Sequence, residues 1–225
     1  MRIHVEALFT RDSAGRLLRV NEPDGNPAPR FFLGRTPEGN EWRFRADLPG
    51  HLVAALETAC RDENPGPELL VPPYGAKRYE ALLAPSAPIV HRWAGPAFCF
   101  VGELPPPVAA IPVTEANLDL LRPHLEDWCP DALLRQPALM VLDEGRAVSL
   151  CCSVRQSPLA HEAGVETAPA FRGRGYATRA ATAWAVAVRR LGRLPLYSTS
   201  WQNAASRALA GRLGLERYGT DLHFT

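Results

Sequence analysis

The pattern of apolar and polar positions differs between the two halves of the chain. In the first half, the apolar residues of Gly50–Arg61 recur at helical spacing and predict a helix. Two short apolar runs, Pro88–His91 and Ala97–Val101, predict strands. The segment Asn21–Arg30 combines Pro, Gly and Asn and predicts a loop. The first half is therefore expected to be an α+β region.

A proline-rich segment lies between the two halves. Three consecutive prolines end the segment Gly102–Pro107. Proline has no backbone N–H to donate and favours an extended polyproline form. We therefore predict a domain boundary here, with residues 1–104 on one side and residues 105–225 on the other.

The second half predicts a regular alternation of strands and helices. Thr114 is placed to cap a helix that carries Leu118, Leu121 and Leu125 on one side, with Pro123 inside it. A tight turn at Glu144-Gly145 predicts a hairpin. The predicted strands are Ala138–Leu142, Ala147–Val154, Ala160–Thr167 and Leu194–Ser200, the later helices are Tyr176–Leu191 and Asn203–Leu213, and the last extended segment is Glu216–Phe224.

Composition and charge narrow the classes of partner. Apolar residues make up 46% of the 225 positions, which is enough for a proper core. The 25 basic and 24 acidic side chains nearly cancel, whereas a protein that neutralises a phosphate backbone needs a basic excess. We therefore expect no nucleic-acid partner.

The cysteines and the N-terminal segment indicate in which cellular compartment the protein is expected. Five cysteines without a C-x-x-C pair suit neither a disulfide scaffold nor a zinc site, so we expect no metal. Met1–Asp12 holds no apolar run long enough for a signal peptide, and no stretch approaches the roughly 20 apolar residues that span a bilayer. The expectation is a cytoplasmic protein that does not enter membranes.

One segment carries candidate chemistry: the loop Arg172-Gly173-Arg174-Gly175 between the predicted strand ending at Thr167 and the predicted helix starting at Tyr176. The first N–H groups of a helix lack partners and carry partial positive charge, so they favour an anion such as phosphate. Arginine adds bidentate contacts to phosphate oxygens. The alternative is a solvated, flexible turn. The loop fits neither a P-loop nor a dinucleotide-binding fingerprint.

The loop resembles the pyrophosphate loop of the GNAT superfamily of N-acetyltransferases, Q/R-x-x-G-x-G/A, with Arg172, Gly175 and Ala177 at the matching positions. Val165–Pro169 resembles the splayed strand that precedes this loop in the family. The resemblance implies an α/β acyltransferase fold for the second half: a mixed, mainly antiparallel, splayed sheet flanked by helices.

A further motif extends the resemblance to about Ile111–Thr225. Asn203-Ala204-Ala205-Ser206, with Leu209, Leu213 and Gly214, resembles the family's N-x-x-S/A-x-x-L…LGF ending, although Leu215 stands in place of phenylalanine. The first half contributes nothing to the resemblance. It is expected to select the substrate or to be a degenerate copy of the same fold.

The resemblance implies a binding site for acetyl-CoA. Backbone groups of Glu166, Thr167 and Ala168 would hold the pantetheine arm, and Asn203 with Ser206 would lie near its sulfur end. The pyrophosphate would be held by the loop and the start of the helix, that is by Arg172, Gly173, Arg174, Gly175, Tyr176, Ala177, Thr178 and Arg179.

The resemblance also implies direct attack of an amine on the thioester, which needs a base for the amine and an acid for the departing thiolate. Glu166 is the preferred base, and His161, on the opposite side of the same strand, is the alternative. The family's usual acid is a tyrosine seven residues after the asparagine, but that position is Ala210. Tyr197, Tyr218 or solvent are the substitutes.

Two functions follow from these residues. The first is an acetyl-CoA-dependent N-acetyltransferase acting on an amine of a small molecule or peptide. The second is a catalytically silent acyl-CoA-binding sensor or interaction module, suggested by Ala210. A second copy of the chain, in a homodimer, is a further candidate partner.

Overall fold

The computed structural model describes residues 1–23, 25–66, 68–106 and 109–225. The chain divides into two compact units, each made of more than one segment. The first unit comprises Met1–Ala97, Thr199–Asn203 and Arg217–Thr225, and the second comprises Phe98–Ser198 and Ala204–Glu216. Pro107, in the predicted boundary segment, lies outside the described residues, and the boundary at 104/105 stays a prediction.

The first unit is an α+β structure in which strands from both ends of the chain are neighbours. β3 pairs antiparallel with β11, from Arg35 opposite Thr220 to Phe31 opposite Phe224. All five residues of β3 are buried because both faces of the strand are covered: Phe31 and Leu33 belong to one apolar cluster, and Phe32 to another that includes residues of α1. The strand order is β4-β3-β11-β5, with β1-β2 as a separate pair. The elements are α1 (Arg2–Leu8), β1 (Phe9–Arg11), β2 (Leu17–Val20), β3 (Phe31–Arg35), β4 (Asn40–Phe44), α2 (Gly50–Arg61), α3 (Ala76–Leu83), β5 (Arg92–Cys99) and β11 (Glu216–Phe224).

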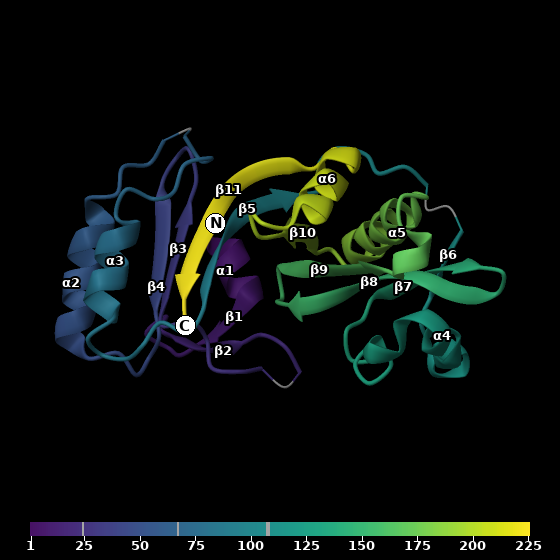
Figure 1. The fold of residues 1–225 in the computed structure, drawn as a ribbon, viewed down its shortest axis with the longest axis horizontal. Coiled ribbons are helices and arrows are strands. Elements are labelled where there is room, and N and C mark those ends of the chain that lie inside the picture. The colour runs from purple at the N-terminus through teal and green to yellow at the C-terminus, as the bar shows by residue number, and fades with distance from the viewer. Residues whose placement is uncertain (24, 67, 107–108) are drawn as a thin grey trace. The chain divides into compact units, whose positions relative to one another are not determined.

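Helices α2 and α3 pack beside β3 and β4 and form the core of this unit (Figure 1). The apolar stripe of α2, including Leu52 and Leu56, faces Phe31 and Tyr79 in that core. The helix predicted over Gly50–Arg61 is confirmed with the same bounds.

Of the two short strands predicted before the boundary, Pro88–His91 is wrong, and Ala97–Val101 is right only for Ala97–Cys99. Pro88–His91 is not a strand, and a single strand, β5, spans Arg92–Cys99. Gly95 and Pro96 occur inside β5, and such residues normally mark the end of a strand in a sequence pattern. The pairing that keeps them in a strand comes from distant segments, which the local pattern does not contain.

The second unit contains a five-stranded run in the order β10-β9-β8-β7-β6. Pairing is antiparallel except between β9 and β10, which run parallel. The hairpin predicted at Glu144-Gly145 is confirmed, with both residues at positive φ (47° and 77°). The elements are β6 (Ala110–Pro112), η1 (Glu115–Leu121), α4 (Arg122–Leu125), η2 (Glu126–Trp128), β7 (Ala138–Asp143), β8 (Arg146–Gln156), β9 (Ala160–Thr167), η3 (Pro169–Phe171), α5 (Tyr176–Arg190), β10 (Leu194–Ser198) and α6 (Ala204–Arg212).

The predicted helix after Thr114 has a different form. Asn117 Oδ1 accepts a hydrogen bond from Thr114 N at 2.8 Å, so Thr114 does begin the segment. The segment is then a 3₁₀ helix, η1, followed by the one-turn α4, in which Pro123 removes a backbone donor. Leu121 and Leu125 are nevertheless buried together, as their spacing predicted.

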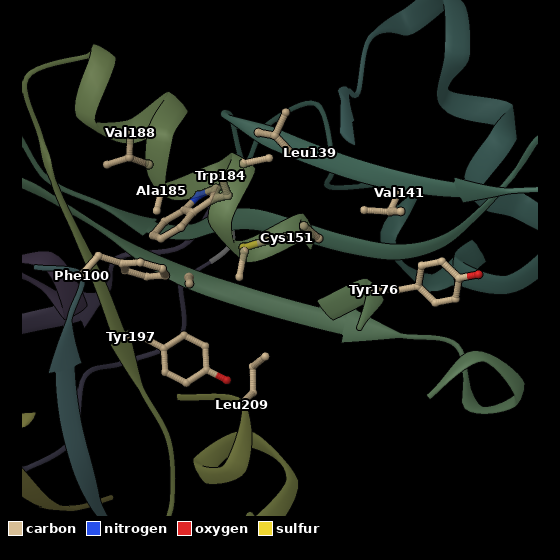
Figure 2. Close-up of a cluster of buried hydrophobic side chains, with 14 of the residues drawn as sticks. Phe100, Leu139, Val141, Cys151, Tyr176, Trp184, Ala185, Val188, Tyr197 and Leu209 are labelled. Atoms are coloured by element: carbon tan, nitrogen blue, oxygen red, sulfur yellow. The ribbon is translucent and has the colours of Figure 1, made fainter. Parts of the chain in front are cut away.

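Helices cover both faces of this sheet (Figure 1). α5 packs on one face, where its fully buried Trp184 lies among residues of β8, β10 and α6. Figure 2 shows this cluster, with the Trp184 indole above Cys151 and Phe100. η1 and α4 pack on the opposite face.

Strands β9 and β10 are paired over only part of their length. The parallel register runs from Ala160 opposite Leu194 to Glu162 opposite Leu196. β9 continues to Thr167 and β10 to Ser198, and in the described chain no register joins these last parts. The splayed sheet expected from the resemblance is therefore present, with the opening towards the end of β9.

Candidate functional site

Two glycines in the loop between β9 and α5 adopt the left-handed backbone conformation. Gly173 and Gly175 have φ values of 79° and 80°, in the left-handed region that other residues rarely adopt. A Cβ built on either glycine would meet no atom within 4 Å. Glycine is therefore required here by backbone conformation rather than by lack of room, and the space beside the loop is open.

Three arginines surround the start of α5. Arg172 and Arg174 are exposed, and the Arg172 Nε donates to Thr167 O at 3.1 Å. The Arg174 guanidinium lies 5.5 Å from the centre of the Phe171 ring, and that of Arg179 lies 4.6 Å from the ring of Tyr176. No acidic residue occupies the first turn of α5.

This end of α5 therefore attracts anions. Its first N–H groups have no acceptor within the helix, and the helix dipole adds positive charge to that of the three arginines. Tyr176 is buried in the core, which fixes the start of the helix, while Ala177 and Thr178 are half-buried. The described geometry fits a pyrophosphate group.

The end of β9 is held by hydrogen bonds within the chain. Ser149 Oγ donates to Glu166 O at 2.9 Å and lies 2.8 Å from Thr167 Oγ1. Ala168 N donates to Val148 O at 2.9 Å, and Ala168 O accepts from Phe171 N at 2.9 Å. Both backbone groups of Ala168 are thus already used, so its predicted contact with the pantetheine arm would have to share the carbonyl.

Glu166, the preferred base, is exposed near the end of β9. Its Oε2 accepts a hydrogen bond from Trp128 Nε1 at 2.5 Å. Gly164, two residues earlier, lies on the same face, since a Cβ there would meet Trp128 at 3.3 Å. Trp128 had no signal in the sequence, because nothing in its spacing connects it with a residue 38 positions later.

His161, the alternative base, faces the side of the sheet that α5 covers. It is buried, and its Nδ1 lies 2.8 Å from Ser153 Oγ, which in turn accepts from Trp184 Nε1 at 3.0 Å. Burial, and secondarily the charge of Arg193, lower the pKa of His161. The structure therefore does not bring the two candidate bases together.

A tyrosine of β10 lies beside α6, although α6 itself carries no tyrosine at position 210. Tyr197, on β10, has its hydroxyl 2.6 Å from Ser206 Oγ on α6. Burial raises the pKa of Tyr197, and the hydrogen bond to Ser206 only partly offsets this. Ala210, one turn after Ser206, is buried. Asn203 directly precedes α6 and donates its backbone N–H to Ser200 O at 3.1 Å.

The segment that contains the loop is similar to a known acyltransferase family, which favours the anion-binding interpretation of the loop over a solvated turn. Residues 138–220 match the family model described as GNAT acetyltransferase. Over these residues the chain is similar to the GNAT acetyltransferase family. The match includes the loop, α5, Tyr197 and the whole asparagine motif, so the resemblance predicted from the sequence is confirmed.

Solved structures agree with this domain at the level of the fold. A GNAT-family acetyltransferase from Novosphingobium aromaticivorans DSM 12444 superposes with a TM-score of 0.52 and 18% identity, over 60% of this chain and 65% of that one. A GCN5-related N-acetyltransferase-like protein from Streptococcus suis 89/1591 gives 0.50 and 17%, over 88% and 85%. A GCN5-related N-acetyltransferase from Sphaerobacter thermophilus gives 0.50 and 18%, over 92% and 79%. No curated protein matches the chain.

Two features of the described residues concern metals and membranes. Within the part of the chain that the structure describes, no three His, Cys, Asp or Glu side chains gather closely enough to hold a metal ion. Among the same residues, no helix has the length and apolar character needed to cross a membrane.

Proposed function

We propose that the GNAT domain transfers an acetyl group from acetyl-CoA to an amine of a small molecule or peptide. The observation that carries this proposal is the Arg172–Gly175 turn, which presents two left-handed glycines, exposed arginines and the start of α5 to the same open space. The thioester supplies the activated acetyl group, and the chain supplies binding, orientation and proton transfer.

Binding of the pyrophosphate is assigned to the loop. The N–H groups of the first turn of α5 donate to its oxygens, and Arg172 and Arg174 add charge-assisted contacts. The pantetheine arm is assigned to the splayed opening between β9 and β10, where the strands have parted after Glu162 and Leu196.

Glu166 is assigned the role of base. Its carboxylate takes a proton from the amine, and the hydrogen bond from Trp128 holds Oε2 in position. His161 is not used in this proposal, because it lies on the opposite face of β9 and its Nδ1 is engaged by Ser153.

Tyr197 is assigned the role of acid in place of a tyrosine at position 210. Because the pKa of Tyr197 is raised by burial, its hydroxyl keeps its proton at neutral pH. Tyr197 Oη gives that proton to the departing thiolate, and Ser206 Oγ orients the hydroxyl from 2.6 Å away.

Calorimetric titration with CoA and acetyl-CoA tests the binding half of the proposal. We expect Arg172→Ser with Arg174→Ser to weaken CoA binding by roughly tenfold or more, since charge-assisted hydrogen bonds contribute about 1.5 to 3 kcal/mol. The matched control is Arg190→Ser, which removes an exposed arginine from the opposite end of α5. Wild-type protein that binds neither compound would refute the proposal.

A thiol-release assay with a panel of amines tests the catalytic half. Release that depends on an added amine supports the transferase. CoA binding without turnover on any amine supports the second candidate, a silent sensor, which is favoured by the buried Ala210 at the usual position of the acid.

We also propose a reducing compartment, the cytoplasm, for this protein. All five cysteines, Cys60, Cys99, Cys129, Cys151 and Cys152, are free thiols. Non-reducing electrophoresis of protein isolated from cells under thiol-blocking conditions would detect any disulfide.

A further inference from the structure

A hollow lies in the second unit, at the start of β9. It has a volume of about 570 Å³, and its lining includes Gln136, Pro137, Pro158, His161, Leu191 and Arg193. We call it the His161 pocket. It includes none of the loop residues assigned to CoA. We propose that the His161 pocket binds a small carboxylic acid with an apolar tail, held by Arg193 and His161.

The hydrogen-bond chain behind His161 determines which ring nitrogen serves the pocket. The Trp184 indole N–H can only donate, so Ser153 Oγ accepts it at 3.0 Å. Ser153 keeps its own hydrogen, and we assign this hydrogen to the bond with His161 Nδ1, 2.8 Å away. In the neutral ring the remaining hydrogen is therefore on Nε2, and among the described residues Nε2 has no hydrogen-bond partner. His161 thus offers the pocket a donor.

Arg193 gives the pocket a positive charge. Its Nη1 donates to Ser157 O at 2.6 Å, which fixes the side chain and leaves its other N–H groups for a ligand. In the described part of the chain Arg193 has no acidic partner, and no aspartate or glutamate lines the pocket. The lowered pKa of His161, due first to burial and then to Arg193, agrees with a positive site that lacks a counterion.

The rest of the pocket is apolar. Pro137 and Pro158 line it, and the side chain of Leu191 is 57% exposed at its edge. Leu159 and Leu194, 52% and 48% exposed, are joined by a hydrogen bond between Leu194 N and Leu159 O and lie next in sequence to the lining residues Pro158 and Arg193. Exposed leucines beside a cavity are typical of ligand sites.

These features select the class of ligand. An amine would face Arg193 without any carboxylate to pair with, and a purely apolar compound would leave the donors of Arg193 and His161 unsatisfied. A carboxylate satisfies both donors, and an apolar tail covers the leucines. The site would let such an acid bind independently of CoA.

Calorimetric titration with hexanoate, hexanamide and acetate tests the proposal. Hexanoate is expected to bind, with hexanamide and acetate each weaker by roughly tenfold or more, since the first lacks the charge and the second the tail. Hexanoate affinity should persist in the Arg172→Ser, Arg174→Ser variant, because the loop is not involved. This result separates the pocket from the proposed CoA site, whichever way the CoA experiment turns out.

Two independent substitutions locate the binding. Arg193→Gln is expected to weaken hexanoate binding by roughly tenfold or more, whereas Arg190→Gln, which removes a nearby exposed charge, leaves it unchanged. Leu191→Ser, at an exposed position that folding tolerates, should weaken hexanoate but not acetate. Thermal unfolding verifies that each variant is folded.

Nuclear magnetic resonance of the imidazole nitrogens gives a direct readout. His161 is expected to carry its proton on Nε2 in the free protein, and that resonance should shift when hexanoate is added. Absence of hexanoate binding to the wild type, equal binding to folded Arg193→Gln and Arg190→Gln variants, or an unperturbed His161 would each overturn the proposal.

Discussion

Trp128 Nε1 donates a hydrogen bond to Glu166 Oε2 at 2.5 Å and so ties a short 3₁₀ turn to the end of β9. If Glu166 is the base, Glu166→Gln should reduce kcat by roughly a hundredfold or more, because a positioned general base contributes at least this factor. Affinity for CoA should not change. Turnover by thiol release and affinity by calorimetry measure the two effects.

Trp128→Phe tests whether the hydrogen bond matters. It keeps an aromatic ring but removes the donor, and we expect a loss of kcat of roughly tenfold, smaller than that of Glu166→Gln. Glu144→Gln, in the β7–β8 turn, is the matched control for removing an acid. A Glu166→Gln variant with full activity would exclude Glu166 as the base.

The sequence predicts those elements best whose signals are local. β9 and β11 have the predicted bounds, because the apolar pattern and the turn residues that mark these bounds are local. The pairing of β11 with β3 is not predictable in this way, since it joins residues nearly two hundred positions apart. The first part of β5, Arg92–Pro96, is not predicted by the local pattern for the same reason.

In the candidate site, too, the features with local signals are predictable and the contacts between distant segments are not. The anion loop is a continuous motif and is visible in the sequence. The partner of Glu166 is Trp128, and the partner of Ser206 is Tyr197, so each pair depends on how separate elements pack. The sequence indicates both members of the second pair, but nothing in it shows that they are in contact.

Tyr197→Phe tests the proposed acid. We expect kcat to fall by roughly a hundredfold, while loss of the hydrogen bond to Ser206 costs about 1 kcal/mol of stability. An alternative substrate separates the role of acid from a merely structural role of Tyr197. This substrate is an acetyl thioester of a more acidic thiol, whose thiolate leaves without needing a proton. This substrate should restore most of the rate to Tyr197→Phe, and an unchanged defect would contradict the assignment.

Asp221, on β11, makes the stability of the first unit depend on pH. Its carboxylate accepts from Trp93 Nε1 at 3.0 Å and from His4 Nε2 at 3.4 Å, and the group is buried. Burial alone would raise the pKa of Asp221. The hydrogen bond and charge of His4, together with His223 and Trp93, outweigh burial and lower this pKa below the ordinary aspartate value of 3.8. The stabilisation is therefore complete at pH values above the pKa of the unfolded state, and it is lost as the pH falls through the lower pKa of the folded state.

Urea unfolding between pH 7 and pH 3 measures this effect. Other carboxylates also titrate in this range, so the informative quantity is the difference between wild type and Asp221→Asn. We expect the variant to be less stable at pH 7 by about 3 kcal/mol, as when one partner of a buried pair is removed, and the difference to shrink towards pH 3. Asp119→Asn, at an exposed position, should show no such trend, and a constant difference for Asp221→Asn would contradict the linkage.

Glu63, after α2, joins three segments of the first unit. Its carboxylate accepts from Tyr74 N and Gly75 N, both at 2.8 Å, and from Tyr79 Oη at 3.1 Å. It also lies 3.4 Å from Arg35 Nη1, and both side chains are more than nine-tenths buried. Glu63→Gln leaves a buried guanidinium without its charge partner and replaces one acceptor by a donor. We therefore expect unfolding to become easier by about 3 kcal/mol, measured by urea denaturation.

The control for this prediction is Glu57→Gln on α2. Glu57 lies 3.7 Å from Arg61, but both side chains are largely exposed, so the pair contributes about 0.5 kcal/mol or less. The two substitutions make the same chemical change close together in the chain, and they differ in burial and in the number of hydrogen bonds lost. Equal effects would mean that the Glu63 cluster does not stabilise the first unit, whereas a large difference would assign the stabilisation to the buried Glu63 cluster as a whole.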